Sequence, residues 1–202
     1  LAIVGAVVVG CWAAYRPNSL ADRFSSLLSM TAASIPDFWF AITGVWLFAV
    51  LLGVLPTSGV DAGVLSWILP VATLMIRPLG VLTQVVRGAM VSALSAPYIR
   101  LARSKGAGDF RVVSHHALRN AAAPALTVAG DLMVSLINGA VVVEAIFGWP
   151  GIGKLMIDAI LQRDFAVLQA AVLLTAVSIF LLNIIIDACY ALLDARVREP
   201  AR

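Results

Sequence analysis

Four long apolar segments constrain the fold of this chain more than any other feature. They are residues 35–55, 67–93, 121–147 and 165–193. A helix that crosses the hydrocarbon core of a bilayer needs about 20 mostly apolar residues, so each segment is long enough to span a membrane. Apolar residues make up 61% of the 202 residues and charged residues only 12%. A soluble domain of this size could not bury so many apolar side chains, which excludes an ordinary cytosolic enzyme, a disordered tail and a nucleic-acid-binding module.

A fifth apolar run, residues 1–14, is shorter than a full span. As a helix it would be roughly 21 Å long, against a hydrocarbon core of about 30 Å. It has no basic region before it and no small-residue cleavage site, so we interpret it as the second half of a membrane helix whose start lies upstream. The sequence therefore predicts an all-α, polytopic transmembrane helical bundle with about five helices visible, the first partial, and six in the full protein.

Basic residues gather in alternate loops. Residues 16–28, 94–120 and the tail after residue 193 carry two, five and three Lys or Arg, whereas 56–66 carries none and 148–164 carries two. Basic loops stay on the cytoplasmic side of a membrane. This bias predicts that the loops 16–28 and 94–120 and the C-terminus are cytoplasmic.

The loop 94–120 contains a predicted short helix over residues 95–106. Pro97 suits the first helical position, and Gly106 suits the left-handed residue that follows the last turn. Tyr98, Leu101 and Ala102 fall on one face of this helix. Asp109 is expected to cap a second helix over 110–120. From the pattern alone, the first helix fits a groove on a partner protein as well as it fits the lipid headgroup surface.

One motif resembles a nucleotide-binding loop but is interpreted differently. Residues 148–154, GWPGIGK, satisfy G-x-x-x-x-G-K. Leu155 stands where a hydroxyl would hold Mg²⁺, a membrane helix precedes the motif instead of a strand, and the charge bias places it outside the cell. We interpret it as a turn. His115 and His116 are adjacent and cannot share a metal as i, i+4 ligands, so we predict no catalytic residue, no metal site and no cofactor bound by this chain.

Arg77 is the most unusual residue within a predicted span, because a charge at bilayer depth costs about 2.5–3.5 kcal/mol on insertion scales. It lies beside Pro78, which favours a kink. Three interpretations stay open for it: a residue lining a substrate path, an ion pair with Asp131, or snorkelling made possible by the kink. Arg87, nearer the cytoplasmic end, is expected to snorkel.

A polar stripe runs along the segment 121–147. Thr127, Asp131, Ser135 and Asn138 recur at helical spacing on an otherwise apolar helix. The stripe is either a wall of a water-filled path or a set of hydrogen bonds to other helices. Glu144, near the outer end, has a gating or a structural role. The predicted translocation path comprises Arg77, Thr127, Asp131, Ser135, Asn138 and Glu144.

Four stretches of the chain resemble one known family. They are YIRLARSKGAGDFRVVSHHALRNAAAP, GAVVVEAIFGWPGIGKLMIDAI, LLNIIIDACYALLDARVR and LGVLPTSG. Together they are similar to the B-type permeases of dipeptide and oligopeptide ABC importers, the inner-membrane components of binding-protein-dependent transport. The resemblance covers essentially the whole visible chain. In the wider importer class the cytoplasmic loop carries an E-A-A…G pattern, which Ala102 and Gly106 match, while Arg100 and Leu101 stand at the other two positions.

The resemblance implies a single transmembrane permease domain over residues 1–202, of the type I ABC importer kind, with residues 94–120 as its cytoplasmic coupling loop. It favours a protein partner for the short helix, which would dock on an ATPase subunit. The implied coupling residues are Tyr98, Arg100, Leu101, Ala102, Arg103, Ser104, Lys105 and Gly106. The N-terminal helix and the external region after it would precede the visible chain.

The resemblance also implies a function and partners. The chain would be a multi-pass permease subunit of the bacterial inner membrane that moves di- and oligopeptides inward. It would pair with a second, homologous permease, two ATPase domains that hold ATP and Mg²⁺, and an external substrate-binding protein. Two alternatives are an ion-coupled secondary transporter with Asp131 or Glu144 as proton carrier, and an importer of the same family for nickel complexes, glutathione or haem. A membrane scaffold without transport activity would not need the polar stripe.

Overall fold

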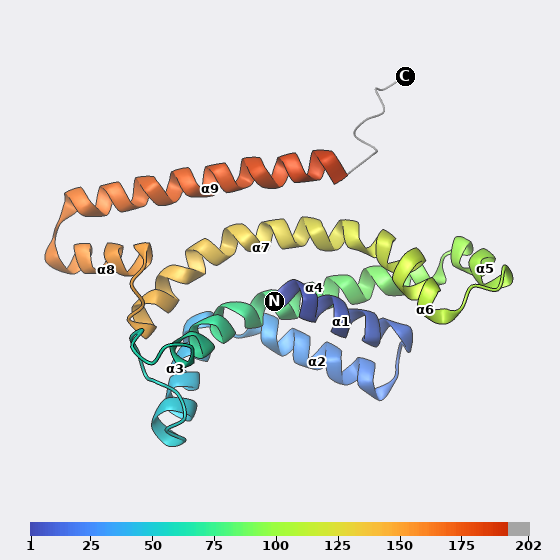
Figure 1. The fold of residues 1–202 in the computed structure, drawn as a ribbon, viewed down its shortest axis with the longest axis horizontal. Coiled ribbons are helices and arrows are strands. Elements are labelled where there is room, and N and C mark those ends of the chain that lie inside the picture. Colours follow the sequence, from blue (N-terminus) through green and yellow to red (C-terminus); the bar gives the residue numbers. More distant parts are fainter. Residues whose placement is uncertain (194–202) are drawn as a thin grey trace. The chain divides into compact units, whose positions relative to one another are not determined.

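The computed structural model describes residues 1–193, with side chains through residue 188, and every regular element in that part of the chain is helical. Figure 1 labels the α-helices along the chain. The elements are α1 (Ala2–Tyr15), α2 (Leu20–Ser34), α3 (Asp37–Gly44), the π-helix η1 (Val45–Leu51), α4 (Leu65–Ser95), α5 (Pro97–Ser104), α6 (Asp109–Arg111), the π-helix η2 (Val112–Ala117), α7 (Leu118–Phe147), α8 (Ile152–Gln162) and α9 (Phe165–Leu193). The predicted all-α class is confirmed. Arg196, Arg198 and Arg202, which contributed to the predicted side of the C-terminus, lie outside the described residues.

In the described part of the chain, three helices are long and apolar enough to cross a membrane: Leu65–Ser95, Asp109–Phe147 and Phe165–Ala188. A fourth candidate, Leu20–Ser34 with Asp37–Leu51, passes only as a pair and is bent by 100°. The helix Ala2–Tyr15 is apolar but shorter. The chain is therefore a polytopic helical bundle, as predicted. The expected span 35–55 is helical only over Asp37–Leu51, which reaches spanning length only together with α2.

The expected loop 16–28 is mostly helix, because α2 begins at Leu20. Ser19 Oγ accepts a hydrogen bond from the backbone N–H of Asp22 at 3.1 Å, and the Asp22 carboxylate accepts one from the N–H of Asn18 at 2.8 Å. This arrangement is similar to a capping box, although the Asp22 carboxylate accepts from Asn18 and not from Ser19, and it satisfies an N–H group that the first turn of a helix leaves free. The serines and charged residues of α2 give it low hydropathy, so an apolar-run criterion misses it.

The second helix of the loop 94–120 also differs from the prediction. Its N-cap is Gly108, without a side-chain cap, so Asp109 does not cap it. The chain continues from α6 through the π-helical turn η2 into α7, giving one helix of 39 residues from Asp109 to Phe147. A π-helical turn absorbs an extra residue without ending the helix, and the sequence pattern gives no sign of it.

The chain divides into two compact units. Residues 1–34 with 75–131 form one unit, and residues 35–74 with the described residues from 132 onward form the other. In the first unit, small residues allow close helix packing: a Cβ at Gly10 would lie 2.8 Å from Val86 Cγ1, and one at Gly80 would lie 2.6 Å from the carbonyl oxygen of Ser29. Such close approach is typical of helices that pack inside membranes.

Each unit has its own apolar core. The core of the first unit comprises Ala14, Val86, Met90, Ala93, Ile99, Val112, Ala117 and Ala121. It joins the C-terminal ends of α1 and α4 and the N-terminal end of α7 to α5 and η2. The core of the second unit comprises Ala41, Leu69, Val143 and Phe147, and Trp67 packs edge-on against Trp149 with ring centroids 4.4 Å apart.

Candidate functional site

The short helix α5 has the ends that its sequence predicts. Pro97 is at the first helical position, after Ala96 in an extended conformation. Gly106 has φ +82°, and its N–H donates to the carbonyl of Arg103 at 2.9 Å. A Cβ at Gly106 would meet no atom within 4 Å, so only the left-handed backbone demands glycine there. The predicted helix in the coupling loop is confirmed as a structural element, while its docking function stays a prediction.

One fully buried residue anchors α5, and most of its other residues are exposed. Ile99 is fully buried in the core of the first unit, together with Met90 and Val112. Tyr98 and Leu101, from the predicted apolar face, are 40% and 57% exposed. The apolar side chains of that face are therefore available to a partner, and the residue that holds the helix in place is one that the sequence pattern did not single out.

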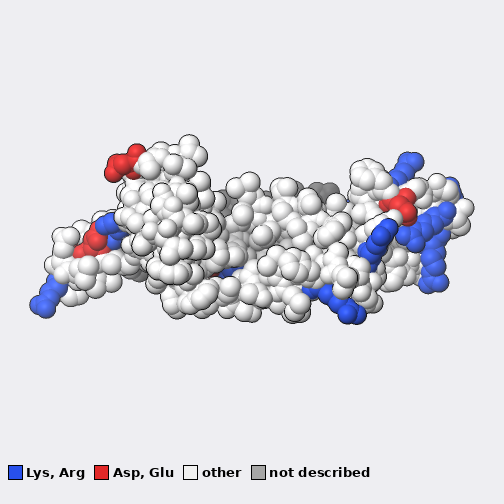
Figure 2. All heavy atoms as spheres, turned by 90° about the horizontal axis from the view of Figure 1, so that it is seen from below, with Lys and Arg blue, Asp and Glu red and all other residues white. Residues whose placement is uncertain are grey.

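Basic side chains surround the exposed face of α5. Figure 2 shows Lys and Arg gathered at the end of the first unit that holds α5 and α6, with one carboxylate among them. The exposed basic residues of this region are Arg100, Arg103, Lys105 and Arg111. Arg103 Nη2 lies 3.7 Å from Asp109 Oδ1, and an exposed pair of this kind contributes at most about 1 kcal/mol. The region therefore offers positive charge beside apolar side chains.

Two hydrogen bonds connect the α5 region to the longer helices. Asn120 Nδ2 of α7 donates to the hydroxyl oxygen of Tyr98 at 2.9 Å. The hydroxyl of Tyr15, the last residue of α1, donates to Asp109 Oδ2 at 2.9 Å. The helix and the turn after it are thus attached to α7 and to α1.

Arg77 is the one exposed residue between positions 69 and 87 of α4. The salt bridges of the described residues do not include one between Arg77 and Asp131, which is also exposed. The ion-pair interpretation of Arg77 therefore finds no support within this chain, and its role in a path stays a prediction.

The four stripe residues of α7, Thr127, Asp131, Ser135 and Asn138, are all exposed in the chain. The hydroxyls of Thr127 and Ser135 donate to carbonyls of their own helix, those of Ala123 at 3.2 Å and Leu132 at 2.9 Å. In these bonds both hydroxyls pair with the backbone of α7 itself. The stripe is an outward-facing polar surface on a helix long enough to span a membrane.

Glu144 closes the turn between α7 and α8. Its Oε2 accepts hydrogen bonds from the backbone N–H groups of Gly153 at 2.7 Å and Lys154 at 3.2 Å. A Cβ at Gly151 would collide with the Glu144 carboxylate, and one at Gly153 would collide with the backbone of Val141. A negative charge is favourable at a helix N-terminus, so this geometry supports the structural role of Glu144.

The same contacts bear on the motif GWPGIGK. In a phosphate-binding loop, free backbone N–H groups and the lysine meet the phosphates. Here Glu144 accepts the hydrogen bonds of two of those N–H groups, and Lys154 Nζ pairs with Asp158 at 2.6 Å. The segment follows a helix and leads into α8, which fits its interpretation as a turn.

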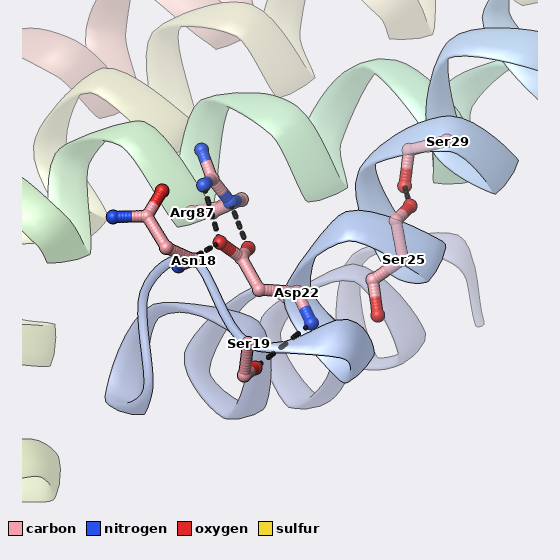
Figure 3. Close-up of polar contacts among 6 residues, drawn as sticks. All are labelled: Asn18, Ser19, Asp22, Ser25, Ser29 and Arg87. Atoms are coloured by element: carbon pink, nitrogen blue, oxygen red, sulfur yellow. Dashed lines mark hydrogen bonds and ion pairs between the residues drawn. The ribbon is translucent and has the colours of Figure 1, made fainter.

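The strongest polar contact in the first unit is one that sequence analysis missed. Figure 3 shows the Arg87 guanidinium facing the Asp22 carboxylate, with the turn of Asn18 and Ser19 beside it. Arg87 Nη2 donates to Asp22 Oδ2 at 2.7 Å, and Arg87 Nε donates to Oδ1. Asp22 is 1% exposed. The S-x-x-D spacing of Ser19 and Asp22 could have located the helix start, but no local signal connects Asp22 to Arg87, which is far away in the sequence.

The histidines and other metal-ligating residues form no cluster in the part of the chain that the structure describes. The rings of His115 and His116 lie edge to face, with centroids 5.5 Å apart. The residues whose side chains the structure describes, 1–188, contain no group of three His, Cys, Asp or Glu residues placed to hold a metal ion.

Comparisons with a family model and with individual proteins identify the same family for this chain. The model of the family described as binding-protein-dependent transport system inner membrane component matches residues 6–199. A putative peptide transport system permease protein of Brucella abortus is 39% identical over 95% of this chain and 63% of its own length. The oligopeptide transport system permease protein AppB of Bacillus subtilis is 37% identical over 98% of this chain and 65% of its own.

A third relative is the di/tripeptide transport system permease protein DppB of Pseudomonas aeruginosa, 38% identical over 96% of this chain and 66% of its own. The chain thus spans about two thirds of the length of these relatives. With a family match across nearly all its residues and relatives well above 30% identity, the chain belongs to the inner membrane components of binding-protein-dependent transport systems.

Proposed function

We propose that this chain forms most of the membrane domain of a permease subunit in an ATP-driven importer of di- or oligopeptides. The family supports a role in transport, and the names of the relatives indicate peptides as the substrate class. A related protein of Sinorhizobium fredii is named as a probable peptide ABC transporter permease. The subunit would lie in the inner membrane with α5 and the C-terminus in the cytoplasm.

The observation that carries the proposal is the exposed, basic and apolar surface of α5. A helix of eight residues is marginal by itself in water, yet this one is fixed by Ile99 and by the Tyr98–Asn120 hydrogen bond. Its other side chains are left for a partner. The coupling surface would comprise Tyr98, Arg100, Leu101, Ala102, Arg103, Ser104, Lys105 and Gly106, docked in a groove of an ATPase subunit.

The exposed polar residues of the spans support a second part of the proposal. Arg77 and Asp131 face out of the chain, and facing lipid would cost each about 2.5–3.5 kcal/mol. They therefore face water or another protein. Together with Thr127, Ser135 and Asn138 they would line a path shared with a second, homologous permease. Glu144 would act from the outer end by holding the α7–α8 turn.

The remaining partners follow from the transport class. Two ATPase domains would hold ATP and Mg²⁺, and an external binding protein would deliver the peptide. ATP binds the two conformations of the complex with different affinity, so its binding and hydrolysis would shift the path between inward and outward access. This chain would supply the path and the coupling helix but no nucleotide site.

The test is purification of the tagged full-length protein in mild detergent, with mass spectrometry of its companions. We expect a second permease and P-loop ATPases, lost when residues 98–106 are scrambled and kept when the exposed segment 60–64, which follows η1, is scrambled as a control. A protein that is recovered alone and moves labelled peptides into liposomes without ATP would support the secondary transporter instead. Competition by nickel complexes, glutathione or haem, but not by peptides, would change the substrate class.

A further inference from the structure

We infer that Asp22 and Arg87 are a positioning pair that holds the coupling helix α5 at a fixed place relative to the hairpin of α1 and α2. The inference rests on the coupling role proposed for α5. It assigns a specific task to a buried ion pair that joins the beginning of α2 to the cytoplasmic half of α4. Without this pair, the hairpin would keep only its apolar and neutral contacts, and its position relative to α5 would vary more.

The geometry is that of a rigid connection. Arg87 donates through both Nε and Nη2 to the two oxygens of Asp22, and the N–H of Asn18 donates to the same carboxylate at 2.8 Å (Figure 3). Two parallel hydrogen bonds fix orientation as well as distance, which a single charge contact cannot do. Asn18 itself has φ +66°, so the carboxylate also stabilises a strained turn between α1 and α2.

Burial makes the pair sensitive to the loss of either member. Asp22 is 1% exposed and the Arg87 side chain is 31% exposed. A buried charge that loses its partner is strongly destabilising locally, because nothing compensates its removal from water. Arg23, which follows Asp22 in the sequence, is exposed and forms no salt bridge among the described residues. It therefore does not replace Arg87 as the partner of Asp22.

A second contact prevents α2 from rotating about the ion pair. Ser25 and Ser29 lie on the same face of α2 as Asp22, and both are buried. Gly80 of α4 approaches so closely that a Cβ would lie 2.6 Å from the Ser29 carbonyl oxygen. Two points of attachment, at Gly80 and at Arg87, set both the direction of α2 and its position along α4.

The connection continues from α4 to α5 almost without a break. Ala96 is the one residue between α4 and α5, and the N–H of Ile99 donates to its carbonyl at 3.1 Å. Met90, one turn after Arg87, shares a core with Ile99 of α5 and Ala14 of α1. A displacement of α5 therefore moves α4 and Arg87 with it. Because Arg87 is bonded to Asp22, the hairpin of α1 and α2 moves as well.

The direct test measures the distance between α2 and α5. Spin labels would be placed at L27C on α2 and L101C on α5, both exposed, in full-length protein in which Cys11 and Cys189 are replaced by alanine. We expect one narrow distance distribution for the parent, and a broader or second distribution for D22N and for R87K. R87K keeps the charge but loses the bidentate geometry. The matched control R16Q, which removes an exposed arginine from the same turn, should leave the distribution unchanged.

The functional test uses the purified complex in liposomes, with a radiolabelled mixture of short peptides as the probe. We expect R87K to retain the ATPase subunits and ATP hydrolysis while peptide import per ATP falls about fivefold or more. A purely structural role would instead lower import, ATP hydrolysis and subunit recovery in parallel.

Unchanged distances in both variants would overturn the inference, and so would unchanged import per ATP in R87K. Failure of the proposed function is distinguishable, because the distance measurement needs neither ATPase nor peptide. A parent protein without ATPase partners but with broadened D22N and R87K distances would keep the positioning role and remove the coupling role of α5. If D22N does not insert into membranes, R87K carries the test alone.

Discussion

Two pairs of charged residues in the helices of the first unit lie in opposite environments, one buried and one exposed. Asp22 and Arg87 satisfy each other in a buried site, whereas Arg77 and Asp131 are exposed and form no salt bridge with each other. All four belong to the same compact unit. A charge in an apolar helix can therefore stabilise the chain that carries it, or remain available to water and other proteins. The type of residue alone does not distinguish the two cases.

The largest expected effect comes from breaking the buried pair. Replacing Asp22 by leucine leaves the Arg87 guanidinium without its carboxylate, which should cost about 3–5 kcal/mol. We expect a large loss of folded protein, measured as the midpoint of thermal unfolding in detergent. D131L changes an exposed carboxylate of the same unit and should leave that midpoint nearly unchanged. An equal drop in the unfolding midpoint for D22L and D131L would contradict the distinction between the buried and the exposed charges.

The next effect concerns the turn held by Glu144. E144Q should lose much of the favourable interaction with the N-terminus of α8 and weaken two hydrogen bonds, at a cost of about 1–2 kcal/mol. Protease accessibility of the segment 148–154 would report the loosened turn. D61N removes an exposed carboxylate outside this turn and serves as control. A variant with unchanged accessibility and strongly altered transport would favour the gating role of Glu144.

A smaller effect on stability is expected at the end of α5. Gly106 has a left-handed backbone, which costs a β-branched residue about 1–2 kcal/mol locally. G106V should therefore insert normally but lose import, since the end of the coupling helix changes shape. R103E should act in the same direction by reversing a charge of the exposed surface. Import at the parental rate in both variants would contradict the coupling assignment.

The smallest effect on stability is expected for the exposed charges of the spans. R77L and D131L should change the free energy of unfolding by less than about 0.5 kcal/mol, since neither residue has a salt bridge among the described residues. Both should nevertheless reduce transport, measured as ATP-dependent peptide uptake with normal recovery of the complex. Loss of the complex itself would show that these residues pack against the second permease instead of lining a path.

Local signals allowed much of this structure to be predicted from the sequence. Pro97 and Gly106 gave the ends of α5, and the apolar runs located α4, α7 and α9. The start of α2 was missed because its serines and charges lower its hydropathy, although the S-x-x-D spacing was visible. The junction at η2 was missed because a π-helical turn has no clear sequence signature.

The site was harder to predict than the fold, because its contacts join distant residues. Arg87 was expected to snorkel, and only the folded chain shows it facing Asp22, 65 positions away. Tyr98 and Leu101 of the predicted apolar face of α5 are exposed, and Ile99, which anchors the helix, is a single residue without periodic partners. For Glu144, the sequence left two roles open, and the hydrogen bonds to Gly153 and Lys154 favour the structural one.

The central claim is that the exposed face of α5 contacts an ATPase subunit, and site-specific photocrosslinking tests it most directly. A photoreactive amino acid at Leu101, which is 57% exposed, would be compared with one at the fully buried Ile99, in full-length protein in its own membrane. The account predicts a crosslink from position 101 to a P-loop ATPase and none from position 99. Crosslinks from position 101 to lipid alone would contradict it and place α5 on the headgroup surface.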